Sequence, residues 1–258
     1  MNSECENITV AVRLRPMLDL ELNLRYWPRW EVEDNYVNEI EGKKSFQFQR
    51  VFGSDVNTED IYEELGEPVV VQCMQGFNGC IFCYGQTGSG KTFTMYGNKN
   101  SPGIVPLAVQ SIFIYVQDTP EEEFLIRCSY LEVYNESVND LLNKNGQNLV
   151  IQEDKKNGLT ILGLNEEICS SLDEIYSLLY IGESNKQFAA TNLNMKSSRS
   201  HCIFRINIES RNRDESGEMS FGTLYLVDLA GSESANVHNT KETVRTMEMK
   251  HINRVKFI

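Results

Sequence analysis

The sequence lacks the features that mark nucleic-acid-binding, membrane-spanning and secreted proteins. Basic residues are few: 24 Lys and Arg stand against 37 Asp and Glu, a formal charge of −13. This balance argues against a generic nucleic-acid binder, whose binding domain carries a basic stripe. No apolar run approaches the ~20 residues of a membrane-spanning helix, and Met1–Val10 is too polar for a signal peptide. We therefore expect neither nucleic acid nor membrane as a partner.

The sequence also lacks a regular cysteine framework. It has seven cysteines, an odd and scattered set, whereas secreted disulfide scaffolds are short and evenly spaced. We therefore expect a reducing cytosolic or nuclear setting. Cys80 and Cys83 form a C-x-x-C pair compatible with redox or metal chemistry, but no second pair or nearby His completes a zinc site. Both lie in the apolar run 79–84, which predicts buried packing of the two thiols.

Strand-like and helix-like segments alternate along the 258 residues, without an internal repeat or a low-complexity linker. Strands are expected at 8–14, 45–52, 80–84, 124–134, 202–210 and 221–227. One helix should run from Asn57 or Thr58 towards Gln75 with an interruption at Pro68, and another should open at Ser171 or Asp173. This order predicts an α/β sheet with helices on both faces. Gly and Pro mark a loop at 98–106.

The sharpest motif is a phosphate loop that fits G-x-x-x-x-G-K-[ST] in full and follows an apolar strand. Its residues are Gly85, Gln86, Thr87, Gly88, Ser89, Gly90, Lys91 and Thr92. The glycines let backbone N–H groups turn towards phosphate oxygens, Lys91 reaches the β and γ phosphates, and Thr92 offers its hydroxyl to Mg²⁺. The helix that begins here points its positive end at the anion. A flexible glycine-rich turn is the alternative.

Two further segments indicate nucleotide chemistry. In 228–233, Asp-Leu-Ala-Gly-Ser-Glu, Asp228 can hold Mg²⁺ through water and Gly231 can present its N–H to a γ-phosphate. In 194–201, Asn-Met-Lys-Ser-Ser-Arg-Ser-His, two hydroxyls, an arginine and an amide can position Mg²⁺, the γ-phosphate and the attacking water. That octamer alone is compatible with a solvated loop, and the other two motifs favour the site. No N-K-x-D segment is present, which argues against a small GTPase.

These three motifs, in this order, resemble those of the kinesin motor domain. Further similar blocks are 13–16, 76–79, 124–136 and 140–142, so the resemblance covers nearly the whole chain, taken as one domain, 1–258. Segments 45–52 and 203–211 look most like the centromere-associated (CENP-E-like) subgroup. The resemblance implies a P-loop NTPase of kinesin type, with ATP or ADP and Mg²⁺ as cofactors.

The resemblance also implies residue roles. Adenine is expected between the segment of Arg13, Arg15 and Pro16 and the ring of Phe93, for which a core aromatic is the alternative. The other implied residues lie around the phosphates: Thr92 and Ser198 as Mg²⁺ ligands, Asp228 through water, Asn194 and Ser197 by the γ-phosphate, and Arg199 paired with Glu248 to order the lytic water.

The chain departs from the family pattern in its last stretch. Ser234 replaces an arginine, residues 235–244 contain no glycine, and Met249 stands where the family has glycine. Family motor domains continue beyond Ile258, so the resemblance implies an incomplete domain that lacks the last strand and helices, with any dimerisation through absent segments. Glycine supplies positive φ freely, so its loss restricts how this loop can fold.

The implied function is an ATP-hydrolysing microtubule motor of the cytoplasm and cytoskeleton, at the spindle or kinetochore in mitosis if the subgroup holds. Tubulin is acidic, so the expected contacts are basic: Lys155, Lys156, Lys241, Arg245, Lys250, Arg254 and Lys256. A solvated charged face is the alternative for these residues. A non-motile nucleotide- or tubulin-binding module is the second functional hypothesis, and a generic P-loop kinase or ATPase is the third.

Overall fold

The computed structural model describes residues 8–154, 158–191, 199–213 and 217–233, which fall into two compact units divided between Ile61 and Tyr62. Several predicted site residues lie outside the described ranges and stay predictions: Lys155, Lys156, Asn194, Ser197, Ser198, Lys241, Arg245, Glu248, Lys250, Arg254 and Lys256. Within the described ranges, no helix combines the length and apolarity needed to cross a bilayer.

The first unit contains two small sheets. One pairs β1 (Ala11–Arg13) in parallel with β5 (Arg50–Phe52), and the other is an antiparallel set of β2 (Trp30–Glu33), β3 (Tyr36–Glu39) and β4 (Ser45–Gln47). Two short helices complete it, α1 (Asp19–Asn23) and α2 (Thr58–Ile61). The Asn57 side chain accepts the Asp60 N–H at 2.8 Å, which confirms the predicted start of a helix here.

Two strand predictions in this unit are wrong in extent. The expected strand 8–14 is only the three residues of β1. The expected strand 45–52 is two strands in different sheets, β4 and β5. The break falls at Phe48. Its N–H donates to the Asn35 carbonyl at 3.0 Å, and after it the chain leaves the β3–β4 ladder and continues towards β5. The side-chain pattern continues across the break, so sequence periodicity does not reveal it.

The second unit is built on a mixed six-stranded sheet. The strand order is β11-β7-β12-β13-β6, and β8 pairs with the C-terminal end of β7. The strands are β6 (Asn78–Cys83), β7 (Glu122–Tyr134), β8 (Ser137–Asp140), β11 (Glu167–Cys169), β12 (His201–Asn212) and β13 (Met219–Asp228). A separate hairpin joins β9 (Val150–Asp154) to β10 (Gly158–Leu162). The predicted strands 124–134, 202–210 and 221–227 are confirmed as β7, β12 and β13.

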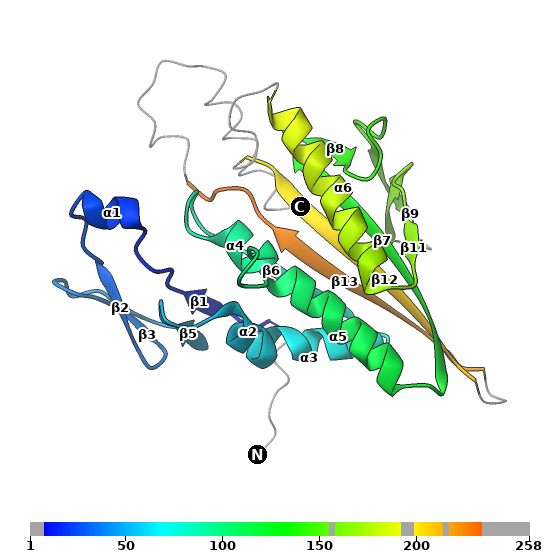
Figure 1. Ribbon diagram of the computed structural model, residues 1–258, viewed down its shortest axis with the longest axis horizontal. Coiled ribbons are helices and arrows are strands. Elements are labelled where there is room, and N and C mark those ends of the chain that lie inside the picture. Colours follow the sequence, from blue (N-terminus) through cyan, green and yellow to red (C-terminus); the bar gives the residue numbers. More distant parts are fainter. Residues whose placement is uncertain (1–7, 155–157, 192–198, 214–216, 234–258) are drawn as a thin grey trace. The chain divides into compact units, whose positions relative to one another are not determined.

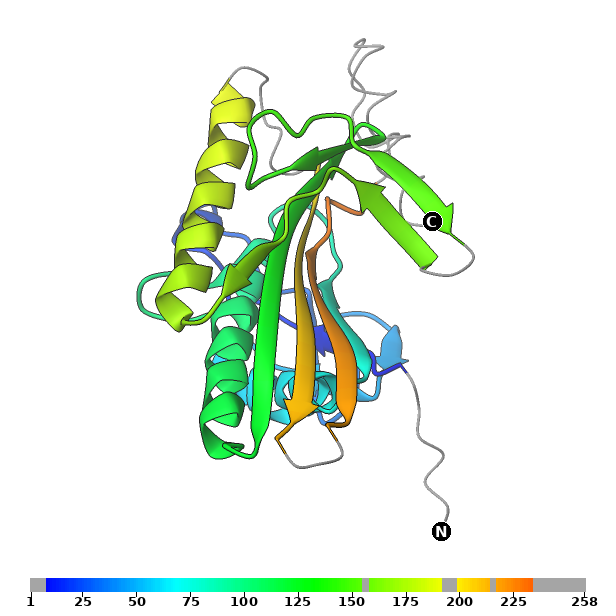
Figure 2. The same cartoon turned by 90° about the vertical axis from the view of Figure 1, so that its right-hand side faces the viewer.

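Helices pack against one face of this sheet and enclose the core (Figures 1 and 2). They are the π-helical turn η1 (Tyr62–Gly66), α3 (Glu67–Met74), α4 (Lys91–Tyr96), α5 (Ile104–Asp118) and α6 (Leu172–Thr191). Alternate residues of β12, among them Phe204, Ile206 and Ile208, are buried beneath them. Burial of one strand face against apolar helix stripes is the main source of stability for such a layer. The predicted α/β class is confirmed, but the predicted helices on both faces are not observed: those of the described residues lie on one face of the sheet.

Three further predictions are corrected here. The helix towards Gln75 is interrupted by η1, with Pro68 tolerated in the first turn of α3. The expected loop 98–106 ends early, because α5 begins at Ile104 and contains Pro106. Cys80 is exposed and Cys83 only partly buried, so their predicted burial is wrong. The reason is that β6 exposes alternate residues on one face, Phe82 among them at 56%.

Candidate phosphate-binding site

The phosphate loop leaves the sheet where two parallel strands end together. β6 pairs in parallel with β13, and the register sets Cys83 opposite Asp228. Residues 84–90 then turn back into α4, as Figure 1 shows at the end of β6. Gly88 and Gly90 have φ of 78° and 97°, a left-handed backbone that glycine adopts without strain. The predicted arrangement of strand, glycine loop and helix is present.

Lys91 is folded onto its own loop. Its Nζ donates to the Gly85 carbonyl at 3.0 Å and to the Gln86 carbonyl at 2.9 Å. Burial lowers the pKa of this lysine, while the carboxylates of Asp228 and Glu233 act in the opposite direction. The ammonium group therefore lies beside the loop, where a phosphate would exchange these carbonyls for a stronger, charged partner.

Thr92 and Asp228 meet directly at this end of the sheet. The Thr92 hydroxyl donates to Asp228 Oδ2 at 2.6 Å. Asp228 is 5% exposed, and burial raises the pKa of its carboxyl group. Its other oxygen, Oδ1, is buried and has no hydrogen-bond partner among the described residues. A hydroxyl and a carboxylate with a vacant oxygen are the donors that Mg²⁺ prefers, so these two predicted metal-site residues fit the ion.

The sequence predictions missed Glu233, which lies on the phosphate loop. Its carboxylate accepts the Thr87 N–H at 2.9 Å and also the Thr87 hydroxyl. The neighbouring Ser232 N–H donates to the Gly85 carbonyl at 3.0 Å. A Cβ at Gly231 would lie 2.4 Å from Glu233 Oε2 and 2.5 Å from Thr87 Oγ1. Only glycine at 231 allows this close approach, and the position of Glu233 within the 228–233 motif was the available signal.

His201 links the other candidate segment to the same region. It is 3% exposed, and its Nδ1 accepts the Ala230 N–H at 3.2 Å. This hydrogen bond connects the first residue of β12 to the segment that follows Asp228. Arg199 is half-buried two residues earlier. Its predicted partner Glu248 lies outside the described residues, so their pairing stays a prediction.

The predicted adenine residues are divided between the two units. Arg15 is held in the first unit by Glu21, with contacts of 2.8 and 2.6 Å. Arg13 donates there to the Thr58 hydroxyl at 3.0 Å. Phe93, in the second unit, is 40% exposed and outside the apolar core, so the core alternative for this ring is not supported. The joint role of these residues with Pro16 in adenine binding stays a prediction.

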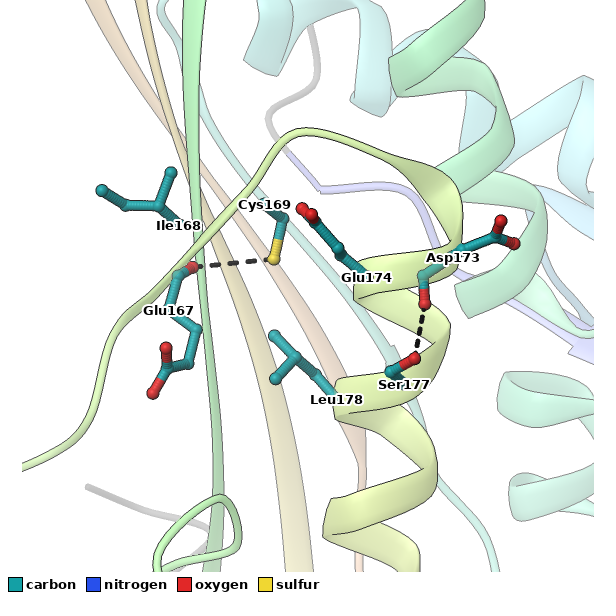
Figure 3. Close-up of a pocket in the computed structure, with 7 residues that line it drawn as sticks. All are labelled: Glu167, Ile168, Cys169, Asp173, Glu174, Ser177 and Leu178. Carbon is teal, nitrogen blue, oxygen red and sulfur yellow. Dashed lines mark hydrogen bonds between the residues drawn. The ribbon is translucent and has the colours of Figure 1, made fainter.

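A shallow groove of about 310 Å³ lies between β11 and the first turns of α6 (Figure 3). Figure 3 shows its lining: Glu167, Ile168, Cys169, Asp173, Glu174, Ser177 and Leu178. Three of these side chains are carboxylates. Their negative charges repel phosphate, which disfavours nucleotide binding in this groove.

A mixed sheet flanked by helices, with a phosphate loop at the end of a strand, defines a P-loop NTPase. The kinesin motor domain family matches residues 13–255. The match runs across both units, and the chain belongs to this family. Segments 45–52 and 203–211 suggested the centromere-associated subgroup, which the comparisons do not support, because the relatives described next carry KIN-7 names.

The relatives include long plant proteins. Kinesin-like protein KIN-7C, mitochondrial, of Arabidopsis thaliana is 42% identical over 254 residues, which cover 96% of this chain and 28% of that protein. Kinesin-like protein KIN-7D, chloroplastic, of Oryza sativa subsp. japonica is 44% identical over 254 residues, covering 96% and 25%. The chain thus spans about a quarter of the length of these relatives.

The fold is also similar to a solved structure described as that of a fast kinesin, with implications for ATPase mechanism and interactions with microtubules. The TM-score is 0.88 at 36% identity, and the match covers 95% of this chain and 71% of that chain.

Proposed function

We propose that this chain binds ATP or ADP with Mg²⁺ through Gly85–Thr92, and that the intact protein couples ATP hydrolysis to movement along microtubules. The observation that carries the proposal is the placement of Lys91 and Thr92 at the start of α4, beside the buried carboxylate of Asp228. Family membership and the likeness to a solved kinesin support the same function.

The described residues supply positioning and charge, which account for most of phosphoryl-transfer catalysis. In this proposal the loop N–H groups from Gly85 to Gly90 and the Lys91 ammonium hold the phosphates. Thr92 would hold Mg²⁺ directly and Asp228 would hold it through water, and the ion would neutralise phosphate charge. Ser198 adds a Mg²⁺ ligand, and the residues proposed by the γ-phosphate are Asn194, Ser197 and Gly231. Arg199 and Glu248 order the attacking water. The residues proposed for adenine are Phe93, whose ring stacks on the base, and Arg13, Arg15 and Pro16.

The partner in this proposal is the microtubule. The basic residues at 155–156 and in 241–256 are its proposed contacts, because positive charge attracts the acidic tubulin surface. A cytoskeletal location follows from this partner. The centromere-associated subgroup, and with it the spindle or kinetochore, rests on segments 45–52 and 203–211 alone.

The first test is nucleotide binding. Fluorescent ADP should bind the wild-type chain in the presence of Mg²⁺, and Lys91→Ala should abolish binding because phosphate loses its charged partner. Lys99→Ala, at an exposed position in the loop after α4, is the matched control and should bind like wild type. Equal affinity of wild type and Lys91→Ala would contradict the site.

The second test separates a motor from the alternative, a non-motile binding module. Steady-state hydrolysis is measured with and without microtubules, together with gliding of microtubules over the surface-bound protein. Hydrolysis and gliding by the chain extended to the full family length would support the motor. Nucleotide binding without either would favour the module.

A further inference from the structure

We propose that Cys128 and Cys169 form an oxidation site, at which a neutral hydroperoxide converts the two thiols into a disulfide between β7 and β11. Small uncharged hydroperoxides, hydrogen peroxide among them, are the substrates of this site. β11 and β6 lie at opposite edges of the six-stranded sheet, and the phosphate loop follows β6. The inference is therefore independent of the proposed nucleotide function.

The first support is the register of the two strands. β11 pairs antiparallel with β7, and the register sets Cys169 opposite Ile126 and Glu167 opposite Cys128. The two cysteines are therefore diagonal neighbours on one face of the sheet, since residues two apart in a strand share a face. That face is the buried one: Cys128 is 0% and Cys169 4% exposed, and both belong to the apolar core.

The second support is direct contact between the thiols. The Cys128 thiol is hydrogen-bonded to the Cys169 sulfur, and the Cys169 thiol donates to the Glu167 carbonyl at 3.7 Å. The shift that closes an S–S bond falls to β11, which has three residues and lies at the edge of the sheet. Among the described residues no three His, Cys, Asp or Glu side chains gather as metal ligands. Oxidation is therefore favoured over metal binding, which takes four ligands in a closed zinc site.

The third support is the groove that leads to Cys169. Its volume of about 310 Å³ is large against the ~30 Å³ share of one water molecule in the liquid. Figure 3 shows the Cys169 sulfur among the lining side chains, together with the apolar Ile168 and Leu178. The three carboxylates of the same lining repel anionic oxidants. A neutral hydroperoxide is therefore the class of oxidant that fits the groove.

The contact between the thiols also assigns their roles. The hydrogen bond from Cys128 lowers the pKa of Cys169, although burial and the charges of Glu174 and Glu167 oppose this shift. The same hydrogen bond raises the pKa of Cys128, and burial adds to the rise. Because the thiolate is the nucleophile, Cys169, which lines the groove, is the attacking sulfur. Cys128 keeps its proton and is the resolving sulfur.

The reaction has two balanced steps. The Cys169 thiolate attacks one peroxide oxygen: an S–O bond forms, the O–O bond breaks, and the other oxygen leaves as an alcohol, or as water from hydrogen peroxide. The sulfur is thereby oxidised to a sulfenic acid and the peroxide is reduced. The Cys128 sulfur then attacks the Cys169 sulfur: an S–S bond forms, the S–O bond breaks, and hydroxide leaves with the Cys128 proton as water. A dithiol reductant reverses the product by exchange.

The experiment treats the reduced full chain with tert-butyl hydroperoxide and counts the thiols after denaturation. Wild type should lose two of its seven thiols, dithiothreitol should restore them, and peptide mass spectrometry should show a cross-link between Cys128 and Cys169. Cys80→Ser is the matched control, because Cys80 is an exposed thiol on β6 at the opposite edge of the sheet, and this variant should form the same cross-link. Chain unfolded in urea before the peroxide is added should lose the preference for this pair.

Two variants separate the roles of the sulfurs. Cys128→Ser removes the resolving thiol, so dimedone should trap a sulfenic acid at Cys169. Cys169→Ser should abolish the cross-link and leave Cys128 reduced. Far-ultraviolet circular dichroism checks that each variant folds, and Cys128→Ala or Cys169→Ala, which place no hydroxyl in the core, replace a serine variant that does not.

The class of oxidant is tested by an internal ratio. Oxidation of Cys169 relative to the exposed Cys80 should be higher with tert-butyl hydroperoxide than with the anion peroxymonosulfate, and an equal ratio would overturn the assignment of a neutral oxidant. Absence of the cross-link in folded wild type, or oxidation that modifies Cys80 and spares Cys169, would overturn the site itself. Equal dimedone labelling of Cys169 in wild type and Cys128→Ser would overturn the role of Cys128.

Discussion

Gly182 on α6 offers a test in which two known effects have opposite signs. A Cβ at this position would lie 2.1 Å from Cδ1 and 2.5 Å from Cε1 of Tyr130, well inside the ~3.5–4.0 Å optimum for carbon atoms. Alanine is favoured over glycine in a helix interior by about 1 kcal/mol. Forcing an extra methyl group into a packed core costs ~1–3 kcal/mol. The sign of Gly182→Ala depends on whether Tyr130 can move.

The surroundings of Tyr130 oppose such movement. The residue is 0% exposed, and its ring meets Phe204 edge to face at 5.5 Å. Its hydroxyl is 2.9 Å from the Tyr96 hydroxyl and donates to Glu183. Moving the ring would break these bonds between α4, β7 and α6. We therefore expect Gly182→Ala to destabilise the second unit by about 1–2 kcal/mol, a sizeable share of the ~5–15 kcal/mol of a typical domain.

The assay is urea unfolding followed by far-ultraviolet circular dichroism. Both tryptophans, Trp27 and Trp30, lie in the first unit, so their fluorescence reports that unit separately. Ser184→Ala, exposed on the same helix, should be neutral or slightly stabilising, because it changes helix propensity alone. In a Tyr130→Leu background the cost of Gly182→Ala should shrink, because the clashing ring is gone. Equal or greater stability of Gly182→Ala in the wild-type background would refute the reasoning.

Three further predictions follow. Burial raises the pKa of the Asp228 carboxyl group, so the fold loses stability as pH rises through that pKa and the group ionises. Asp228→Asn should therefore unfold at a higher urea concentration at pH 7. The same change should weaken Mg²⁺-dependent ADP binding. The hydrogen bonds of Arg15, then of the Leu18 N–H, lower the pKa of Glu21 to about 2. The first unit should therefore lose stability, by tryptophan fluorescence, as pH falls from the unfolded value of about 4.3 through 2, and Glu21→Gln should flatten this dependence. ATP turnover by this chain should be slow and little stimulated by microtubules. The reason is that residues 235–244 contain no glycine, whereas the loop at this place in the family has glycines that let it rearrange. Strong stimulation by microtubules in a steady-state hydrolysis assay would contradict this prediction.

The parts of the fold that could be predicted have local signals. The phosphate loop is a fixed spacing of glycine, lysine and threonine, and its strand and helix carry their own patterns. β7, β12 and β13 are long enough for apolar alternation to stand out. α5 was not predicted, and its start was assigned to a loop because Gly103 and Pro106 also mark loops. Pro106 lies in the first turn of the helix, where no helical N–H partner is lost.

Burial was predicted less well than secondary structure, because it depends on what covers each face. The run 79–84 is apolar throughout, which indicates a strand buried on both sides. In the structure β6 alternates, and Cys80, Phe82 and Tyr84 share the exposed face. Nothing within the run distinguishes these residues from their partly buried neighbours. The difference comes from α3, which packs on the opposite side of the strand.

The site shows the same division between local and long-range information. Lys91 and Thr92 follow from the loop spacing, but their partners lie far along the chain: Thr92 meets Asp228 136 residues later, and Thr87 meets Glu233 146 residues later. The parallel register of β6 and β13 creates both contacts, and no local pattern encodes a register. Motif spacing therefore predicts the phosphate-binding residues, whereas only the sheet shows that the Glu233 carboxylate contacts Thr87 of this loop.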